Sequence, residues 1–360
     1  MVNLACGQEI TQDTTLVADL TCTNGPALII AADNVTLDLA GFTVSGDLAS
    51  GSDSPGILFR GVHGSTVRDG TVQHFAAGVA IQGGGRNLVQ NVTTQDNIGG
   101  GNFGDGIVID GSTENRIEGN TVLRNGPYSG ITLLNKATHN DIRHNIVMDN
   151  NMSQAGDPSA GRQDMGIRIE GPGASHNKVE SNTITGSGGD GITVLPVCTN
   201  LDTGQPCVGE GNRFNRIINN TSNSNGVSGR GDGIKMFCMQ TPVAPSDNTI
   251  VGNFTNNNTT YGVCFDARCN KNEASGNSAH GNGQYDGYDA NDPPCETNEW
   301  EDNDFLAVNQ PCVGGPKTTA NGFYTNRPVL PGQAGPGSGQ VSMEMILSVL
   351  HANLARAKKA

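Results

Sequence analysis

The chain has 360 residues, of which 35% are hydrophobic and 4% aromatic, and 51 are glycine. This hydrophobic content is that of a folded protein, whereas the few aromatic and many glycine residues favour a repetitive β architecture with many turns. The formal net charge of −14 argues against nucleic acid as a partner, because bulk electrostatics would repel a polyanion. The sequence also contains no apolar run of about 18 residues, so it predicts no membrane span.

The N-terminal segment, MVNLACGQEI, shows no signal peptide and is interpreted as the start of a mature chain with an added methionine. Six of the nine cysteines form closely spaced pairs, which we expect to be disulfides: Cys6 with Cys22, Cys198 with Cys207, and Cys295 with Cys312. Such pairs favour an oxidising compartment, so we expect a secreted or periplasmic protein. Cys238, Cys264 and Cys269 remain, and at least one of these thiols should be free; a bond of Cys238 with one of the other two stays open.

A short strand-like element that opens with glycine, usually as Gly-Ile, recurs along the chain. Its glycines lie 22 to 42 residues apart: Gly56, Gly78, Gly106, Gly130, Gly166, Gly191, Gly233, Gly262 and Gly287. Most of these elements are followed by Asn-x-apolar-x-x-Asn, as at 115–120, 140–145 and 177–182. A period in the low twenties with glycine or asparagine at the corners is typical of a solenoid, in which stacked asparagines bond from coil to coil. The pattern predicts an all-β solenoid of about nine coils over residues 1–312.

Three longer segments interrupt this repeat, at 151–164, 196–211 and 238–247. Because they flank the same central coils, we interpret them as functional loops, with insertion at a tolerant corner as the alternative. Residues 313–341 are rich in glycine and proline and are expected to form a tail or linker. Residues 342–360 are expected to form an amphipathic helix with Ser342 as its cap, which packs on its own chain or mediates self-association or partner binding.

The Gly-Ile elements, the asparagine pattern and the N-terminal run at 25–46 resemble the right-handed parallel β-helix repeat proteins of the pectate-lyase-like superfamily, in particular the secreted bacterial type. The resemblance covers about residues 5–312. It implies a single-stranded right-handed parallel β-helix whose active site lies on a parallel sheet face between protruding loops. The superfamily includes lyases, uronan epimerases, glycoside hydrolases, adhesins and metal-delivery proteins, so the fold alone does not choose among them.

Side chains that alternate along the Gly-Ile strands predict one functional strip on the outer face of the solenoid. In GDGIKMF (231–237) the two-residue period sends Lys235 outward, so we expect it not to be buried. Coils lie about 4.8 Å apart, so neighbouring coils add further members to the strip. The strip then contains Arg168, Glu170, Asp190, Asp232, Lys235, Phe237, Tyr261, Asp266 and Arg268. The alternative is a solvated face of compensating charges, and Asp105 is interpreted as a turn residue only.

The favoured function is that of a lyase or epimerase acting on an extracellular polysaccharide that contains uronic acids. Lys235 would take the C5 proton, and Arg168, about 10 Å away, or the nearer Arg268 would neutralise the sugar carboxylate. Glu170, Phe237, Tyr261 and Asp266 are the expected substrate contacts. Asp190, Asp232 and Asp266 are candidate ligands for Ca²⁺, which prefers oxygen ligands, but the same carboxylates would raise the pKa of Lys235.

The alternative enzyme is a glycoside hydrolase that uses paired carboxylates. Asp190 and Asp232 on adjacent coils should stand about 5 Å apart, which matches a retaining pair. Their proximity would raise one pKa, as a general acid requires. A non-catalytic carbohydrate-binding, surface-structural or metal-delivery role remains the third possibility.

Overall fold

The computed structural model describes residues 4–23, 25–47, 54–99, 104–152, 164–196, 211–238, 244–292 and 294–314. The chain divides into two units, Met1–Val329 and Leu330–Ala360, and the second unit lies outside the described residues. The expected tail at 313–341, apart from its first two residues, the expected helix at 342–360 and most of the three predicted loops therefore also lie outside them. The regular elements of the described part are short strands joined by turns, together with one 3-10 turn at Pro311–Gly314.

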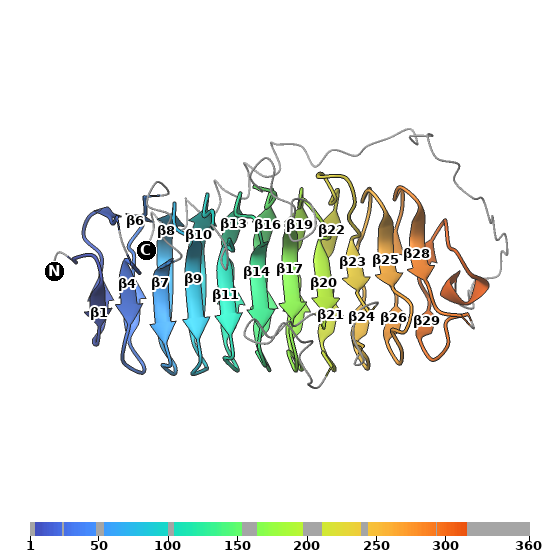
Figure 1. Cartoon of the computed structure of the whole chain (residues 1–360), viewed down its shortest axis with the longest axis horizontal. Coiled ribbons are helices and arrows are strands. Elements are labelled where there is room, and N and C mark those ends of the chain that lie inside the picture. Colours follow the sequence, from blue (N-terminus) through green and yellow to red (C-terminus); the bar gives the residue numbers. More distant parts are fainter. Residues whose placement is uncertain are drawn as a thin grey trace, which may run out of the picture. The chain divides into compact units, whose positions relative to one another are not determined.

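Eleven parallel strands form sheet A, the long row that crosses the molecule in Figure 1. In order they are β1 (Gln8–Ile10), β4 (Leu28–Ile30), β7 (Pro55–Arg60), β9 (Ala77–Gln82), β11 (Ile107–Asp110), β14 (Ser129–Leu134), β17 (Met165–Glu170), β20 (Ile192–Leu195), β23 (Ile234–Met236), β25 (Tyr261–Phe265) and β28 (Tyr285–Asp289). Each coil thus contributes one strand, and its neighbours in the sheet come from the preceding and following coils.

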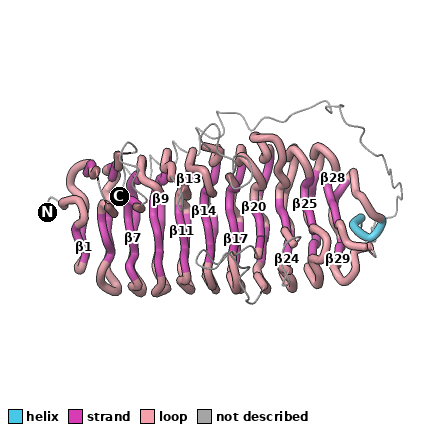
Figure 2. Tube along the Cα trace, viewed as in Figure 1, coloured by secondary structure: helices cyan, strands magenta, loops and turns pink. Residues whose placement is uncertain are grey.

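The other strands stack in two further parallel columns, and Figure 2 shows the loops and turns that connect the strands. One column contains β2 (Thr14–Thr15), β5 (Thr36–Asp38), β12 (Arg116–Glu118), β15 (Asp141–Arg143), β18 (Lys178–Glu180), β21 (Arg216–Ile218), β24 (Thr249–Val251), β26 (Glu273–Ser275) and β29 (Glu299–Glu301). The other contains β3 (Leu20–Thr21), β6 (Thr43–Ser45), β13 (Thr121–Leu123), β16 (Ile146–Met148), β19 (Thr183–Thr185), β22 (Thr221–Asn223), β27 (Ser278–Ala279) and β30 (Asp304–Phe305). The long strands β8 (Thr66–Gln73) and β10 (Leu88–Gln95) belong to both columns, and together the three columns define a parallel β-helix.

The core is a stack of aliphatic side chains that repeat from coil to coil. Ile107, Ile131 and Ile167 are register partners in sheet A and are fully buried. The glycine that opens each strand is needed for space: a Cβ on Gly130 would lie 2.6 Å from Val147 Cγ1 and 2.7 Å from the carbonyl oxygen of Gly166 on the next coil. The recurring glycine of Gly-Ile is therefore required because neighbouring coils pack closely at this corner.

Asparagine ladders run along the corners, as the sequence pattern predicts. In one ladder, Asn145 Oδ1 accepts hydrogen bonds from the backbone N–H and the Nδ2 of Asn120, at 2.9 and 3.0 Å. Asn145 Nδ2 in turn donates to Asn182 Oδ1 on the following coil. Since these side chains are buried, each bond satisfies groups that water cannot reach.

The number of coils differs from the prediction, whereas two of the predicted disulfides are present. The expected nine coils were too few, because the count was based on glycines followed by a hydrophobic residue, whereas Gly7 precedes Gln8 in β1 and Ala27 takes the glycine position before β4. The disulfides Cys6–Cys22 and Cys295–Cys312 are confirmed, and Cys238 pairs with Cys269. Cys198 and Cys207 lie outside the described residues, among which Cys264 is a free, buried thiol.

No helix in the described part of the chain is long and apolar enough to cross a membrane.

Candidate functional site

Toward the C-terminal end of sheet A, the coils of β20, β23 and β25 hold a group of charged side chains, the Lys235 cluster, which consists of Asp190, Asp232, Lys235 and Asp266. Lys235 Nζ lies 3.2 Å from Asp232 Oδ2 and 3.9 Å from Asp266 Oδ1. The ammonium also lies 5.6 Å from the ring centre of Phe237. The register Thr193–Lys235–Cys264 across β20, β23 and β25 explains why residues from three coils meet here.

Asp190 and Asp232 also hold neighbouring coils together. Asp190 Oδ1 accepts the backbone N–H of Asp232 at 2.8 Å, and Asp232 Oδ1 accepts the backbone N–H of Tyr261 at 3.0 Å. The second oxygen of Asp190 accepts the Thr193 hydroxyl at 2.8 Å. In each carboxyl one oxygen therefore bonds to the backbone of the following coil, and the other oxygen contacts a side chain, Thr193 at Asp190 and Lys235 at Asp232.

The pKa values of Asp232 and Lys235 are both raised within the cluster. Burial, followed by the charge of Asp190, raises the pKa of Asp232 to about 7, although Lys235 opposes the change. Burial alone would lower the pKa of Lys235, but the carboxylates of Asp232 and Asp190 outweigh it and raise that pKa. Lys235 therefore stays protonated at neutral pH, which is unfavourable for the predicted role as a general base.

Lys235 is less exposed than the sequence pattern predicted. Its side chain projects from the outer face of the sheet but is only 20% exposed. Its column mates Thr132, Thr193 and Cys264 are buried, and Arg168 is 5% exposed. The two-residue period correctly gave the direction of these side chains, but direction does not determine what covers them.

Two coils before Lys235, a second group forms around Arg168. Arg168 Nη2 lies 2.9 Å from Glu170 Oε2, and its guanidinium lies 5.3 Å from the ring centre of Tyr128. Asp105, interpreted above as a turn residue only, belongs to this group: it is buried and accepts hydrogen bonds from the backbone of Ser129 and the hydroxyl of Thr132. Burial raises the pKa of Asp105 to about 6, against the lowering effect of Arg168. The shared Gly-Asp-Gly-Ile of Asp105 and Asp232 was the sequence signal that could have identified it.

Tyr261 is brought to the cluster and Arg268 is not. Tyr261 follows Asp232 in the corner column and stacks on Tyr288, with ring centres 4.3 Å apart. Arg268 is exposed in the turn after β25, where its backbone N–H donates to Asn291 Oδ1, and none of the described residues forms an ion pair with its side chain. Tyr285 and Tyr288 were not among the predicted site residues, because in YDGYD the usual Gly-Ile is absent.

The proposed calcium ligands do not form a cation site in this arrangement. Asp232 and Asp266 both face the Lys235 ammonium, so a positive charge already lies between them. Among the described residues, no three or more acidic, histidine or cysteine side chains are grouped so that they could hold a metal ion. Calcium binding stays a prediction from the sequence.

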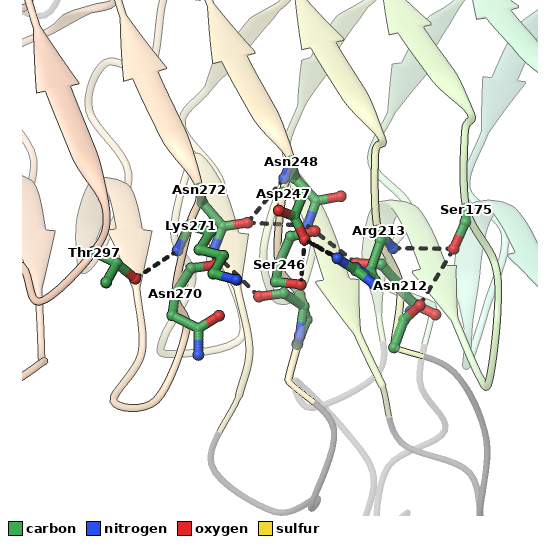
Figure 3. A network of polar contacts seen from close by, with 12 residues as sticks. Ser175, Asn212, Arg213, Ser246, Asp247, Asn248, Asn270, Lys271, Asn272 and Thr297 are labelled. Carbon is green, nitrogen blue, oxygen red and sulfur yellow. Dashed lines mark hydrogen bonds and ion pairs between the residues drawn. The ribbon is translucent and has the colours of Figure 1, made fainter.

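A second polar network lies at the turns that lead into β21, β24 and β26 (Figure 3). Arg213 donates two hydrogen bonds to Asp247 Oδ2, at 2.9 and 2.6 Å, and the Ser246 hydroxyl donates to the same oxygen. Burial would raise the pKa of Asp247, but Ser246 and Arg213 lower it overall. The neighbouring Asn212, Asn248 and Asn272 form coil-to-coil bonds, so we interpret this network as structural.

The comparisons with known proteins agree with this architecture. Residues 12–169 match the model of the family described as "Right handed beta helix region". Together with the stacked parallel strands, the match defines the chain as a right-handed parallel β-helix protein. No curated protein sequence is significantly similar to the chain.

Several solved structures share the fold at low sequence identity. The Dettilon tailspike protein gp208 matches with a TM-score of 0.57 and 16% identity, over 82% of this chain and 55% of its own. The A-module of the Azotobacter vinelandii mannuronan C-5 epimerase AlgE4 gives 0.53 and 12%, over 83% and 80%. The periplasmic alginate epimerase AlgG gives 0.52 and 13%, over 73% and 64%. The chain thus spans less than two thirds of the tailspike and of AlgG, and these likenesses show the fold alone.

Proposed function

We propose that the chain is a polysaccharide-active β-helix protein that hydrolyses glycosidic bonds at the Lys235 cluster. The observation that carries the proposal is the placement of Asp190 and Asp232 on adjacent coils of one sheet face, linked by the bond from the Asp232 backbone to Asp190 Oδ1. Adjacent coils are about 4.8 Å apart, a spacing that corresponds to the carboxyl pair of a retaining glycosidase.

In this mechanism Asp232 is the general acid and Asp190 is the nucleophile. Asp232, with its pKa raised to about 7, gives its proton to the glycosidic oxygen as the bond to the anomeric carbon breaks. Asp190, oriented by the Thr193 hydroxyl, attacks that carbon and forms a glycosyl ester. The deprotonated Asp232 then takes a proton from water, whose oxygen displaces Asp190 and releases the sugar. Lys235 keeps the carboxylates together through both steps.

Two further observations support an extracellular glycan as substrate. AlgG and AlgE4 are, by name, epimerases of alginate and mannuronan, which are polysaccharides. The three disulfides are typical of proteins from an oxidising compartment, so we place this protein in the periplasm or outside the cell.

The second candidate is a lyase or epimerase that acts on a uronic acid. It is favoured by Arg168, a second cation in the same column as Lys235, whose buried Nε has no hydrogen-bond partner among the described residues. Arg168 and Lys235 would then neutralise the sugar carboxylate, and Asp232, rather than Lys235, would take the C5 proton.

One experiment tests both candidates. Purified protein is incubated with alginate, polygalacturonate, xylan and β-glucan, and the products are followed by reducing-end release, by ultraviolet absorbance of unsaturated sugars and by NMR. A hydrolase releases reducing ends without unsaturated sugars, and its rate falls above about pH 7 as Asp232 loses its proton. We expect Asp232→Asn to lose a factor of about 10² to 10⁴ in turnover, while the exposed Asp304→Asn retains it.

The other outcomes are equally distinct. Unsaturated ends identify a lyase, and a changed uronate configuration without chain cleavage identifies an epimerase. Full turnover in Asp232→Asn would remove the Lys235 cluster from the chemistry. Binding of a glycan without any product would leave a carbohydrate-binding protein.

A further inference from the structure

Three tyrosines form an aromatic surface beside the Lys235 cluster. This tyrosine platform consists of Tyr261 on β25 and of Tyr285 and Tyr288 on β28. The rings of Tyr261 and Tyr288 are stacked with centres 4.3 Å apart and an interplanar angle of 7°. Tyr285 lies 5.8 Å from Tyr288 and 6.3 Å from Tyr261, with angles of 29° and 22°. All three side chains are partly exposed, so part of the aromatic surface is open to solvent.

The platform continues the two side-chain columns that build the Lys235 cluster. Tyr261 and Tyr285 are register partners, and the backbone of Tyr261 is bound by Asp232. Tyr288 is the register partner of Cys264, which is in turn the partner of Lys235. The rings therefore begin one coil after Asp232 and extend to the last strand of sheet A.

The buried aromatic residues at this end of the core form a separate group. Phe265 packs on Trp300 with ring centres 4.5 Å apart, and Trp300 packs on Phe305. Phe265 is fully buried and Trp300 and Phe305 nearly so, because strand alternation turns Phe265 to the side opposite Cys264. These three rings therefore fill the core, whereas the rings of the tyrosine platform lie outside it.

We propose that the tyrosine platform is a subsite for an uncharged pyranose ring of a glycan that lies along the solenoid axis, past the Lys235 cluster toward the C-terminal coils. The inference rests on the proposed function, because it takes the Lys235 cluster as the position of the cleaved bond. Aromatic rings with a polar tip bind a ligand that has one apolar face and hydroxyls at its rim, as a pyranose does. The neighbouring sheet face carries the carboxyl groups of Asp190, Asp232 and Asp266 against the cation of Lys235, which favours an uncharged sugar.

The test measures binding apart from catalysis. Neutral xylo- and gluco-oligosaccharides and acidic galacturono- and mannurono-oligosaccharides of graded length are titrated by calorimetry into Asp232→Asn, with and without Tyr288→Ala. We expect Tyr288→Ala to weaken the long neutral oligosaccharides about tenfold and to leave the shortest that bind unchanged, because these need not reach the platform. Tyr288→Phe, which keeps the ring, should bind within about twofold of the parent, and Phe254→Ala, which removes a side chain that is 53% exposed on another face, is the matched control.

The result separates this inference from the proposed function. Equal affinity of Tyr288→Ala and its parent at every length, with unfolding midpoints that show both to be folded, would overturn the subsite even if Asp232→Asn has lost turnover. Preference for the acidic series would overturn its uncharged ligand. Length-dependent loss of binding in a protein that cleaves no glycan would uphold the platform and overturn the hydrolase, and binding of none of these sugars would overturn the subsite.

Discussion

Single aspartates in the Gly-Asp-Gly-Ile elements combine structural and chemical roles. Asp105 and Asp232 each use one oxygen to accept a backbone N–H of the following coil, whereas the ladder asparagines accept a backbone N–H of the preceding coil. An asparagine would make the same bond without the cost of burying a charge, so the carboxyl needs another explanation. At Asp232 the explanation is the proposed acid catalysis; at Asp105 it is the contact with the Arg168 group.

The raised pKa of Asp105 predicts a pH-dependent free energy of unfolding. Because the folded-state pKa of about 6 exceeds the ordinary value of 3.8, Asp105 contributes stability that is fully present below about pH 4 and is lost as the pH rises through 6. A shift of this size corresponds to roughly 2 to 4 kcal/mol. Asp105→Asn, which resembles the protonated form, should therefore remove that part of the decline between pH 4 and pH 8, as measured by urea unfolding.

The exposed Asp304→Asn serves as the control for this measurement, because its side chain is 63% exposed. It should keep the wild-type slope of unfolding free energy against pH. A slope in Asp105→Asn that equals that of the wild type would show that folding does not raise the pKa of Asp105.

At the scale of the strands, the opening glycine of each sheet A element determines how closely coils approach. Gly130→Ala places a methyl group 2.6 Å from Val147 Cγ1 and 2.7 Å from the backbone oxygen of Gly166, neither of which can move without shifting a coil. We expect a loss of about 1 to 3 kcal/mol or more in the free energy of unfolding, measured by denaturant titration.

Gly61→Ala separates this steric effect from backbone strain. Gly61 has a φ of +66°, but nothing lies within 4 Å of the position that an added Cβ would take, so only a conformational cost of about 1 kcal/mol is expected. Equal losses in the two variants would mean that contact between coils does not explain the Gly-Ile pattern.

The strands were predictable from sequence because each repeats the same local rule. Glycine spacing and the Asn-x-apolar-x-x-Asn pattern gave the parallel register, so Arg168, Thr193 and Lys235 do share one column. Burial was not predictable, since it depends on what covers the outer face and not on strand alternation. The same reason applies to the protonation state of Lys235. The sequence predicted its carboxylate neighbours, but it did not predict that Asp232 is almost completely buried.

For the molecule as a whole, the solenoid makes stability local. Each coil bonds mainly to the coil before and the coil after it, so the ends are the points at which unfolding begins. The disulfide Cys6–Cys22 closes the first coil, and Cys295–Cys312 lies after the last strand of sheet A. Near that end Asp289 also accepts hydrogen bonds from Asn298 and from the indole of Trp300. Both ends are thus fastened by contacts that the repeat itself does not supply.

Removal of the N-terminal disulfide should therefore loosen one end and leave the centre intact. In Cys6→Ser/Cys22→Ser the loop that spans a sequence separation of 16 is released, a change worth about 2 to 4 kcal/mol to the region that it stabilises. Hydrogen exchange followed by mass spectrometry should show faster exchange in β1 and β4, whereas β14 and β17, which are bonded to other coils on both sides, should keep the wild-type rates. Asp232 and Lys235 lie on β20 to β25 or beside them, so turnover should also be unchanged. If exchange accelerated equally in all coils, the solenoid would unfold as one cooperative unit, and the disulfide would stabilise the site as well as the end.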